Sequence, residues 1–358
     1  MRGNGKLSRR QFVGAAGGAA AAASVGPLAG VAGAHRGGWD QDDGLGHGDA
    51  DYGFGKGGDI PLDRIGIQLF TIRDLFADNE LDMPGAFELL ADAGYAGFEI
   101  GGDYDGRTPA QVRELAEASG LEPFGNHFGP RSSGPNTWYD PNERARFFEE
   151  AHALGFKVVG TGSDYGAPPT VDGYKAMAEA FNVWGEDAVR NGFRYFYFHN
   201  HDREFRRVDG RPLYDVLLEE SDPRYVKFEL DIGWIEVAGE STYDYLRTWG
   251  SKRFPLFHVK DIRWDPSGPR IAAAGTVNAG RPFFFADVGK GVLDWPKIFS
   301  ALKDPDDHYF IVEHDDAGSD ETVDATSPRP RNPAGSANTA WTGRKYLANL
   351  DIPSRRRL

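Results

Sequence analysis

The strongest constraint on the fold is an alternation, between residues 60 and 350, of short apolar runs with segments whose apolar residues recur at helical spacing. The strand-like runs are 64–70, 95–100, 121–126, 156–160, 193–201, 226–231, 254–260 and 309–313. The helical segments are 84–93, 109–119, 141–154, 171–190, 213–220, 243–249, 295–302 and 337–350. This alternation predicts an α/β protein with the (β/α)8 architecture of a TIM barrel.

An open, doubly wound sheet is the alternative architecture, and it usually carries a glycine-rich phosphate turn after its first strand. Here the first strand leads into Phe70-Thr71-Ile72-Arg73-Asp74, which contains no glycine, so we favour the barrel. Asp209-Gly210 predicts a small hairpin. Residues 263–291 and 318–333 are rich in glycine, proline or polar residues and predict long irregular loops.

The first 59 residues are not expected to belong to the barrel, which we place at 60–351. Ser8-Arg9-Arg10-Gln11-Phe12-Val13 precedes an Ala/Gly run that ends at Ala32-Gly33-Ala34, and this order is typical of a twin-arginine signal peptide over 1–34. Residues 35–59 are Gly/Asp-rich and predict a flexible linker. We therefore expect export to the periplasm or beyond the cell, without a membrane span, because the Ala/Gly run is too weakly apolar.

The charge and the absence of cysteine argue against several classes of function. The formal net charge of -14 argues against nucleic acid as a partner. The chain has no cysteine, which excludes disulfides and thiol catalysis and leaves His, Asp and Glu as metal ligands.

The stretch 195–205, YFYFHNHDREF, is a buried-strand pattern that ends in His199 and His201. Alternate strand residues share a face, so both histidines would point into the barrel mouth, where TIM-barrel active sites lie. The other predicted strands end in the same way. Their polar residues near the C-terminal ends are Gln68, Glu99, His127, Glu229, Asp231, His258, Lys260 and Glu313. So many buried ionisable groups indicate a bound divalent metal, with Mn²⁺, Co²⁺, Zn²⁺ and Mg²⁺ all open.

Six fragments occur in a characteristic order: 66–74, 94–99, 198–202, 228–231, 258–261 and 289–295. In this order they resemble the sugar phosphate isomerase/epimerase family, the xylose isomerase-like TIM barrels. The resemblance implies a metal held by Asp231, His258 and Glu313. Relatives often supply a Glu from strand five; this strand has none, so His199 or His201 would replace it.

The resemblance also implies proton abstraction next to a sugar carbonyl, as in an isomerase, an epimerase or a lyase. We expect Glu229, Lys260 and Glu204 to be catalytic, with a carboxylate or the lysine moving the proton. Gln68, Glu99, His127 and Trp234 are expected to bind the substrate. That substrate would be a small, non-phosphorylated or 3-keto sugar, because phosphorylated sugars are scarce outside the cytoplasm. A non-catalytic sugar-binding barrel and a metal-dependent hydrolase are the alternatives, and a homo-oligomer is left open.

Overall fold

The computed structural model describes residues 58–77, 80–101, 104–129, 140–162, 166–264, 282–318 and 335–352. The predicted signal peptide, the predicted linker up to residue 57 and most of the loop at 318–333 lie outside these ranges. Backbone pairing begins at Gly58 and Asp59, whose N–H groups donate to the carbonyl oxygens of Ala348 and Leu350. These two hydrogen bonds join the first described residues to the end of the last helix.

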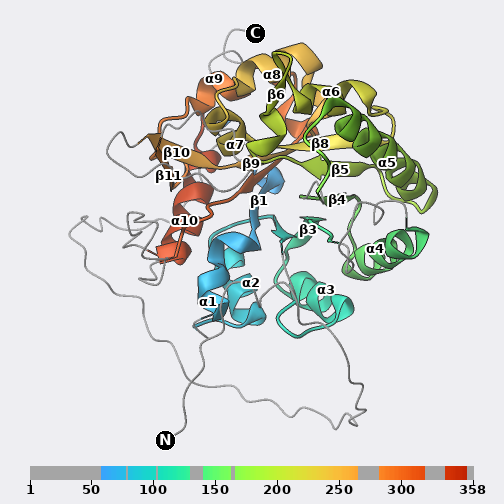
Figure 1. Cartoon of the computed structure of the whole chain (residues 1–358). Coiled ribbons are helices and arrows are strands. Elements are labelled where there is room, and N and C mark those ends of the chain that lie inside the picture. The colour runs from blue at the N-terminus through green and yellow to red at the C-terminus, as the bar shows by residue number, and fades with distance from the viewer. Residues whose placement is uncertain are drawn as a thin grey trace, which may run out of the picture. The chain divides into compact units, whose positions relative to one another are not determined.

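Within the described residues, eight parallel strands form the barrel: β1 (Ile65–Gln68), β2 (Gly97–Ile100), β3 (Glu122–Asn126), β4 (Val159–Thr161), β5 (Phe196–His199), β8 (Val226–Asp231), β9 (Leu256–Val259) and β12 (Tyr309–Val312). Each strand pairs with its neighbours in this series, and β12 pairs back with β1. A parallel bridge between His127 and Gly160 joins β3 to β4. The predicted TIM barrel is therefore confirmed (Figure 1).

Helices surround the strands: α1 (Arg73–Ala77), α2 (Met83–Asp92), α3 (Pro109–Ala118), α4 (Pro141–Leu154), α5 (Val171–Arg190), α6 (Leu213–Glu220), α7 (Ile232–Val237), α8 (Thr242–Trp249), α9 (Trp295–Phe299) and α10 (Gly335–Ala348). Side-chain caps fix their starts: Thr108 and Gln111 form a capping box at α3, and Thr170 caps α5. The described residues also form five 3-10 turns: η2 (Leu62–Arg64), η3 (Leu69–Ile72), η5 (Arg203–Phe205), η6 (Ser251–Arg253) and η7 (Pro305–Asp307). None of the described helices has the length and apolar content needed to cross a membrane.

The predicted bounds of α4, α5, α6 and β8 match the structure, whereas the short helices α1 and α7 were not predicted. The turn at Asp209-Gly210 joins β6 (Arg207–Val208) to β7 (Arg211–Pro212) as expected. The predicted irregular loop at 263–291 is wrong in part. β10 (Asp261–Trp264) and β11 (Phe283–Ala286) pair antiparallel at its two ends, because Phe283 and Phe285 pack against Trp234 of α7 rather than continuing the glycine-rich loop.

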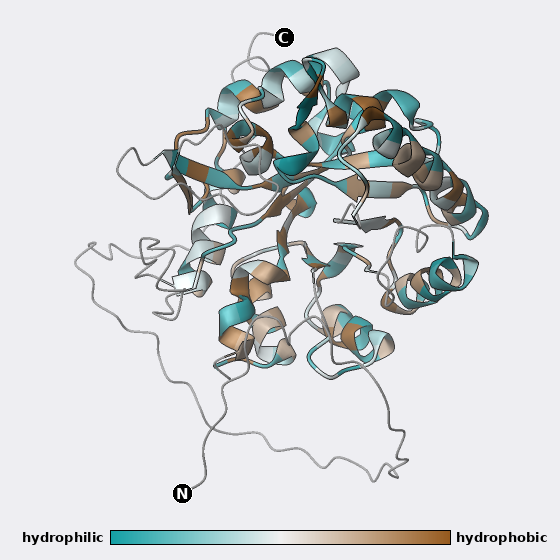
Figure 2. Cartoon of the chain, viewed as in Figure 1, coloured by the Kyte–Doolittle hydropathy of each residue, from teal (hydrophilic) through white to brown (hydrophobic). Residues whose placement is uncertain are grey.

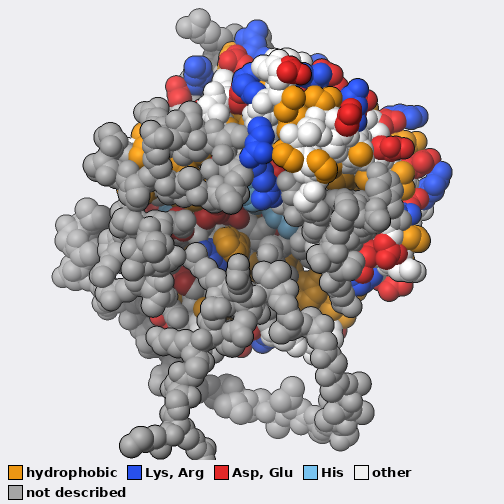
Figure 3. All heavy atoms as spheres, viewed as in Figure 1, with side chains coloured by type: hydrophobic (Ala, Val, Ile, Leu, Met, Phe, Trp, Pro, Cys, Tyr) orange, Lys and Arg blue, Asp and Glu red, His pale blue; other side chains and the backbone are white. Residues whose placement is uncertain are grey.

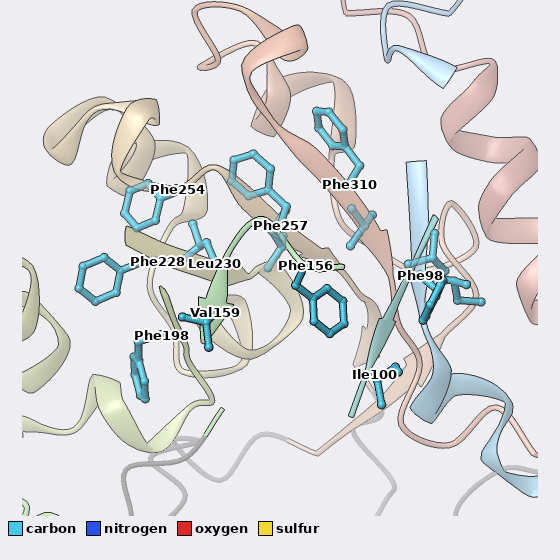
Figure 4. Close-up of a cluster of buried hydrophobic side chains, with 14 of the residues drawn as sticks. Phe98, Ile100, Phe156, Val159, Phe198, Phe228, Leu230, Phe254, Phe257 and Phe310 are labelled. Carbon is cyan, nitrogen blue, oxygen red and sulfur yellow. The ribbon is translucent and has the colours of Figure 1, made fainter. Parts of the chain in front are cut away.

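Outward-facing strand residues form the main core, between the barrel and the helices. Phe198, Phe228 and Phe257 are fully buried there (Figure 4), and the ring of Phe181 in α5 lies 5.1 Å from that of Phe198. Figure 2 shows hydrophobic and hydrophilic residues alternating along α5, as expected for a helix with one face on the barrel. Truncating one of these rings to alanine costs about 3–5 kcal/mol of stability in comparable cores.

The inward-facing positions are apolar in one part of the barrel and polar in the other. A small cluster fills the apolar part: Phe124, Val158, Tyr197, Leu256 and Ile311. Gly66 and Gly97 leave room for the Phe124 ring, since a Cβ at either position would lie 2.6 or 2.5 Å from it. This apolar cluster fills one part of the barrel interior, and the polar inward-facing residues lie on its other side, toward the barrel mouth.

Candidate metal and active site

The candidate site lies at the C-terminal ends of the strands. Glu99 of β2, His199 of β5, Glu229 and Asp231 of β8, and His258 of β9 are all buried there. The neighbouring residues on these strands face outward into the core, so the alternation of the strands sets which side chains meet. Figure 3 shows acidic and histidine side chains near the centre of the face in view.

His258 is bound by carboxylates on both sides. Its Nε2 lies 2.7 Å from Glu99 Oε2, and its Nδ1 lies 2.6 Å from Glu313 Oε2. Burial alone would lower the pKa of His258, but the charges of Glu229, Glu313 and Glu99 hold it well above its usual value. Both ring nitrogens therefore donate in this arrangement. Loss of the Nδ1 proton would expose a lone pair that faces Glu313 and also Asp231, whose Oδ2 is 3.8 Å away.

Glu99 is itself held firmly. It accepts hydrogen bonds from Gln68 Nε2 and from the Tyr197 hydroxyl, both at 2.7 Å. A Cβ at Gly160 would lie 2.5 Å from the Tyr197 ring, so only glycine lets this ring cross the barrel. Gln68 and Glu99, which we expected to contact substrate, are at most 1% exposed. Gln68 contacts Glu99, and Glu99 contacts His258 and Tyr197.

The two carboxylate oxygens of Asp231 have different surroundings. Oδ1 accepts from the Trp234 N–H at 2.8 Å and caps α7. The Asp231 backbone N–H donates to Asn200 Oδ1 at 3.1 Å, which ties the end of β8 to the end of β5. Oδ2 is left to face the other site residues. Asn200 was not predicted as a site residue, and only its place between two histidines pointed to it.

His127 and Glu229 form a second polar pair, with His127 Nε2 2.7 Å from Glu229 Oε2. Burial and the charge of Glu99 raise the pKa of Glu229 to about 7. Burial would lower the pKa of His127, but the charges of Glu99 and Glu229 raise it above the usual value. The His127 side chain is 16% exposed and that of Glu229 is fully buried. Of this pair, His127 is therefore the member with exposed surface, and Glu229 is covered.

The two strand-five histidines are neutral. Burial, reinforced by nearby positive charge, holds the pKa of His199 and of His201 well below the usual value. Neither Nδ1 has a hydrogen-bond partner among the described residues. His199 Nε2 lies 3.9 Å from Asp231 Oδ2, and the His201 ring lies 4.9 Å from the His199 ring. His199 Nδ1 also lies 3.3 Å from Glu229 Oε2. A neutral imidazole offers a lone pair to a metal ion.

Lys260 lies among carboxylates. Its Nζ is 2.9 Å from Asp231 Oδ2, 2.9 Å from Glu313 Oε2 and 3.0 Å from Asp315 Oδ1. Burial would lower the pKa of Lys260, but the charges of Asp231, Asp315 and Glu313 hold it well above its usual value. These carboxylates favour the protonated ammonium, and the proton-moving role that we allowed for Lys260 stays a prediction. Asp315 was missed, although it follows Glu313 by the two-residue spacing of one strand face.

Glu204 has a different environment from the one expected of a catalytic group. The His201 N–H donates to its Oε2 at 2.6 Å, and Arg203 Nε donates to its Oε1 at 2.9 Å. The side chain is fully buried. With both oxygens bound to protein groups, Glu204 is placed to hold the turn that carries His201.

Trp234 is half-buried beside Lys260, with 5.3 Å between Lys260 Nζ and the centre of the ring. The Phe285 ring of β11 lies 5.2 Å from it. Trp234 Nε1 has no hydrogen-bond partner among the described residues. Trp234 thus presents an aromatic ring beside Lys260 and Phe285, and its contact with a substrate stays a prediction.

Within the described residues, two groups of side chains are close enough to hold a metal ion, with ligand atoms within 4.8 Å of one another. The first is Asp231, His258 and Glu313; the second is His127, His199, Glu229 and His258. The structure thus brings together the three ligands that the resemblance implied, places His199 beside them and leaves His201 outside both groups. Imidazole and carboxylate donors fit a divalent first-row cation, which would also balance the buried carboxylates.

The comparison with known families places residues 87–337 in the xylose isomerase-like TIM barrels. This match covers more than half of the chain, and the protein belongs to that family. The resemblance found in the sequence is therefore confirmed.

Individual relatives are distant. An inosose dehydratase of Salmonella typhimurium is 23% identical over 286 residues, which cover 74% of this chain and 88% of that protein. The crystal structure of a sugar phosphate isomerase/epimerase from Parabacteroides distasonis superposes with a TM-score of 0.58 at 22% identity, covering 80% of this chain and 93% of that one. The probable 3-DHS dehydratase AsbF of Bacillus anthracis gives a TM-score of 0.53 at 13% identity, covering 80% and 99%. The two structures share the fold with this chain.

Proposed function

We propose that this protein is a divalent-metal-dependent enzyme that removes a proton from the carbon next to a carbonyl in a non-phosphorylated or 3-keto sugar. The observation that carries the proposal is the convergence of Asp231, His258 and Glu313 at the barrel mouth, beside the proton-exchanging pair of His127 and Glu229. The reaction would be an isomerisation, an epimerisation or an elimination.

Asp231, His258 and Glu313 would hold the metal, with His199 as the fourth ligand in place of the glutamate common in relatives. A divalent cation bound here would polarise the substrate carbonyl and acidify the neighbouring C–H group. Glu99 supports this site because it fixes His258 with Nδ1 turned toward Asp231 and Glu313. We therefore assign Glu99 and Gln68 an orienting role rather than contact with the substrate.

The pair of His127 and Glu229 would carry the proton. A carboxyl pKa of about 7 lets Glu229 exist both with and without a proton near neutral pH, which suits a general base or acid. Since Glu229 is fully buried, His127 is the group that would exchange the proton with the substrate. Lys260 would remain a cation and contribute positive charge only.

The names of the relatives favour the elimination branch. Inosose dehydratase and 3-DHS dehydratase are both named for the removal of water. In that branch the proton leaves the carbon beside the carbonyl, the hydroxyl on the next carbon leaves as water, and a carbon–carbon double bond forms. In an isomerase or epimerase the proton would return to carbon instead. The face of Trp234 would position the ring in either case.

The test is turnover in deuterium oxide, with Mn²⁺-loaded protein and a panel that includes an inosose and a 3-keto-glucoside. NMR would report deuterium on the carbon beside the carbonyl, and ultraviolet absorbance would report an unsaturated ketone. We expect one of these signals, its loss on chelation and its return with metal.

Glu229→Gln should lower the rate by about 100-fold or more, as expected when a general acid or base is lost. Glu117→Gln is the matched control, because this side chain is 61% exposed on α3 and pairs with Arg113 rather than with a residue of the candidate site. Metal binding without exchange or elimination on any ketone would instead indicate a sugar-binding barrel, and turnover that survives chelation would refute the metal-dependent reaction.

A further inference from the structure

The ammonium of Lys260 and the expected metal need the same oxygen atoms. Lys260 Nζ lies 2.9 Å from Asp231 Oδ2 and 2.9 Å from Glu313 Oε2. Asp231 Oδ2 is the oxygen left free after Oδ1 caps α7, and Glu313 Oε2 is the oxygen beside His258 Nδ1. Two cations cannot share these atoms without strong repulsion, because charges a few ångströms apart in a buried site are poorly screened.

Asp315 is the third partner of Lys260, and it differs from the other two. Its Oδ1 lies 3.0 Å from Nζ, but it belongs to neither group of candidate metal ligands. The side chain of Asp315 is 20% exposed, against 8% for Glu313 and none for Asp231. Lys260 can therefore give up Asp231 and Glu313 and still keep one carboxylate.

The surroundings also keep the ammonium close. The ring centres of Trp234 and Phe285 each lie 5.3 Å from Nζ, which is within the range of cation–π attraction. The side chain of Lys260 is only 2% exposed. The charge is thus enclosed by three carboxylates and two aromatic faces, and it does not need to enter water when it shifts.

We propose that Lys260 is an internal counter-ion that neutralises Asp231 and Glu313 until a metal binds, and that Asp315 retains the ammonium when the metal displaces it. This inference rests on the metal site of the proposed function. It makes Lys260 a competitor of the metal and Asp315 a positioning residue that favours metal binding. The metal affinity is then set partly by a lysine that is not a ligand.

The experiment measures Mn²⁺ binding by equilibrium dialysis to four proteins: wild type, Lys260→Met, Asp315→Asn and the double variant. We expect Lys260→Met to bind Mn²⁺ about tenfold or more tightly than wild type, and Asp315→Asn to bind it about tenfold more weakly, effects of the size known for groups behind metal ligands. In the double variant, Asp315→Asn should weaken binding much less, because no ammonium is left to retain. Lys157→Met, which removes an exposed lysine paired with Glu122, is the control for net charge and should leave Mn²⁺ affinity unchanged.

A second measurement uses the thermal midpoint. Without metal, Lys260→Met should melt at a lower temperature than wild type, because buried carboxylates lose their counter-ion, and Mn²⁺ should raise its midpoint by more than that of wild type. Wild-type affinity in Lys260→Met, or an equal effect of Asp315→Asn with and without Lys260, would overturn the counter-ion model while leaving the metal site intact. If none of the four proteins binds Mn²⁺, both the counter-ion model and the metal site of the proposed function are wrong.

Discussion

The contact between Glu99 and His258 makes a quantitative prediction about Glu99→Gln. Glu99 Oε2 accepts from Gln68 Nε2 and His258 Nε2, whereas Oε1 accepts from the Tyr197 hydroxyl. In the variant, the amide oxygen would take the place of Oε2, and the amide NH₂ would face the hydroxyl. The hydroxyl can turn to accept from it, since it already has a second acceptor, the carbonyl oxygen of Asn126 at 3.2 Å. The hydrogen-bond geometry is therefore kept and the negative charge is lost.

The magnitude follows from that exchange. A hydrogen bond to a charged partner contributes about 1.5–3 kcal/mol and a neutral one about 1 kcal/mol, so the bond to His258 should weaken by about 1 kcal/mol. Metal affinity should fall about tenfold, because the carboxylate behind His258 makes the imidazole a better ligand. Loss of the carboxylate also lowers the pKa of His258, so protons compete less with the metal. The loss of affinity should therefore be larger at about pH 9 than at about pH 7.

Equilibrium dialysis with Mn²⁺ at both pH values is the assay. Tyr197→Phe is the matched control, since it removes a hydrogen bond to Glu99 but leaves the carboxylate on His258, and its Mn²⁺ affinity should stay close to that of wild type. Unchanged affinity in Glu99→Gln, or an equal loss in Tyr197→Phe, would refute the idea that the charge of Glu99 orients a metal ligand.

Three further predictions concern other parts of the chain. Gly160→Ala should lower the free energy of unfolding by about 1–3 kcal/mol, because the new Cβ would lie 2.5 Å from the Tyr197 ring; an unchanged denaturant midpoint would show that the ring can move aside. His308 is buried, its pKa is lowered by that burial, and its Nδ1 bonds to the Phe254 carbonyl oxygen at 2.9 Å. The stability that neutral His308 contributes is thus complete above the unfolded pKa of about 6.5 and is lost as the pH falls below it. The denaturant midpoint of His308→Gln should therefore fall less between about pH 7 and about pH 5 than that of wild type. Parallel curves for the two proteins would contradict this. If export uses the proposed twin-arginine signal, Arg9→Lys with Arg10→Lys should leave precursor in the cytoplasm on cell fractionation, and normal export of this variant would contradict the proposal.

The sequence predicted the barrel well because the signal for a buried strand is local. Phe198 and Phe228 alternate with His199 and Glu229 along single strands, so the faces are readable one strand at a time. The aromatic strand β11 was missed for the opposite reason. Its pairing with β10 crosses the segment 265–281, and nothing local in a glycine-rich stretch shows that Phe285 faces Trp234.

The candidate site shows what local sequence patterns cannot predict. The predicted strand ends identified the residues that meet, because parallel strands bring their C-terminal ends to one edge of a barrel. The sequence pattern did not show which side-chain atoms are already hydrogen-bonded to other protein groups. Glu204 and Glu313 look alike in sequence, yet both oxygens of Glu204 are bound by Arg203 and the His201 backbone, whereas Glu313 Oε2 faces His258 and Lys260.

The same limit applies to the charge state of Lys260. Its place on the face of His258 was readable from the two-residue spacing, but its charge state depends on Asp231, Glu313 and Asp315, which come from two other strand ends. In the absence of a metal, enclosure by three carboxylates favours the protonated form of Lys260, as the raised pKa of its ammonium shows. The role of an ionisable residue in this barrel therefore follows from the sum of charges around it, a quantity that the chain acquires only when the barrel closes.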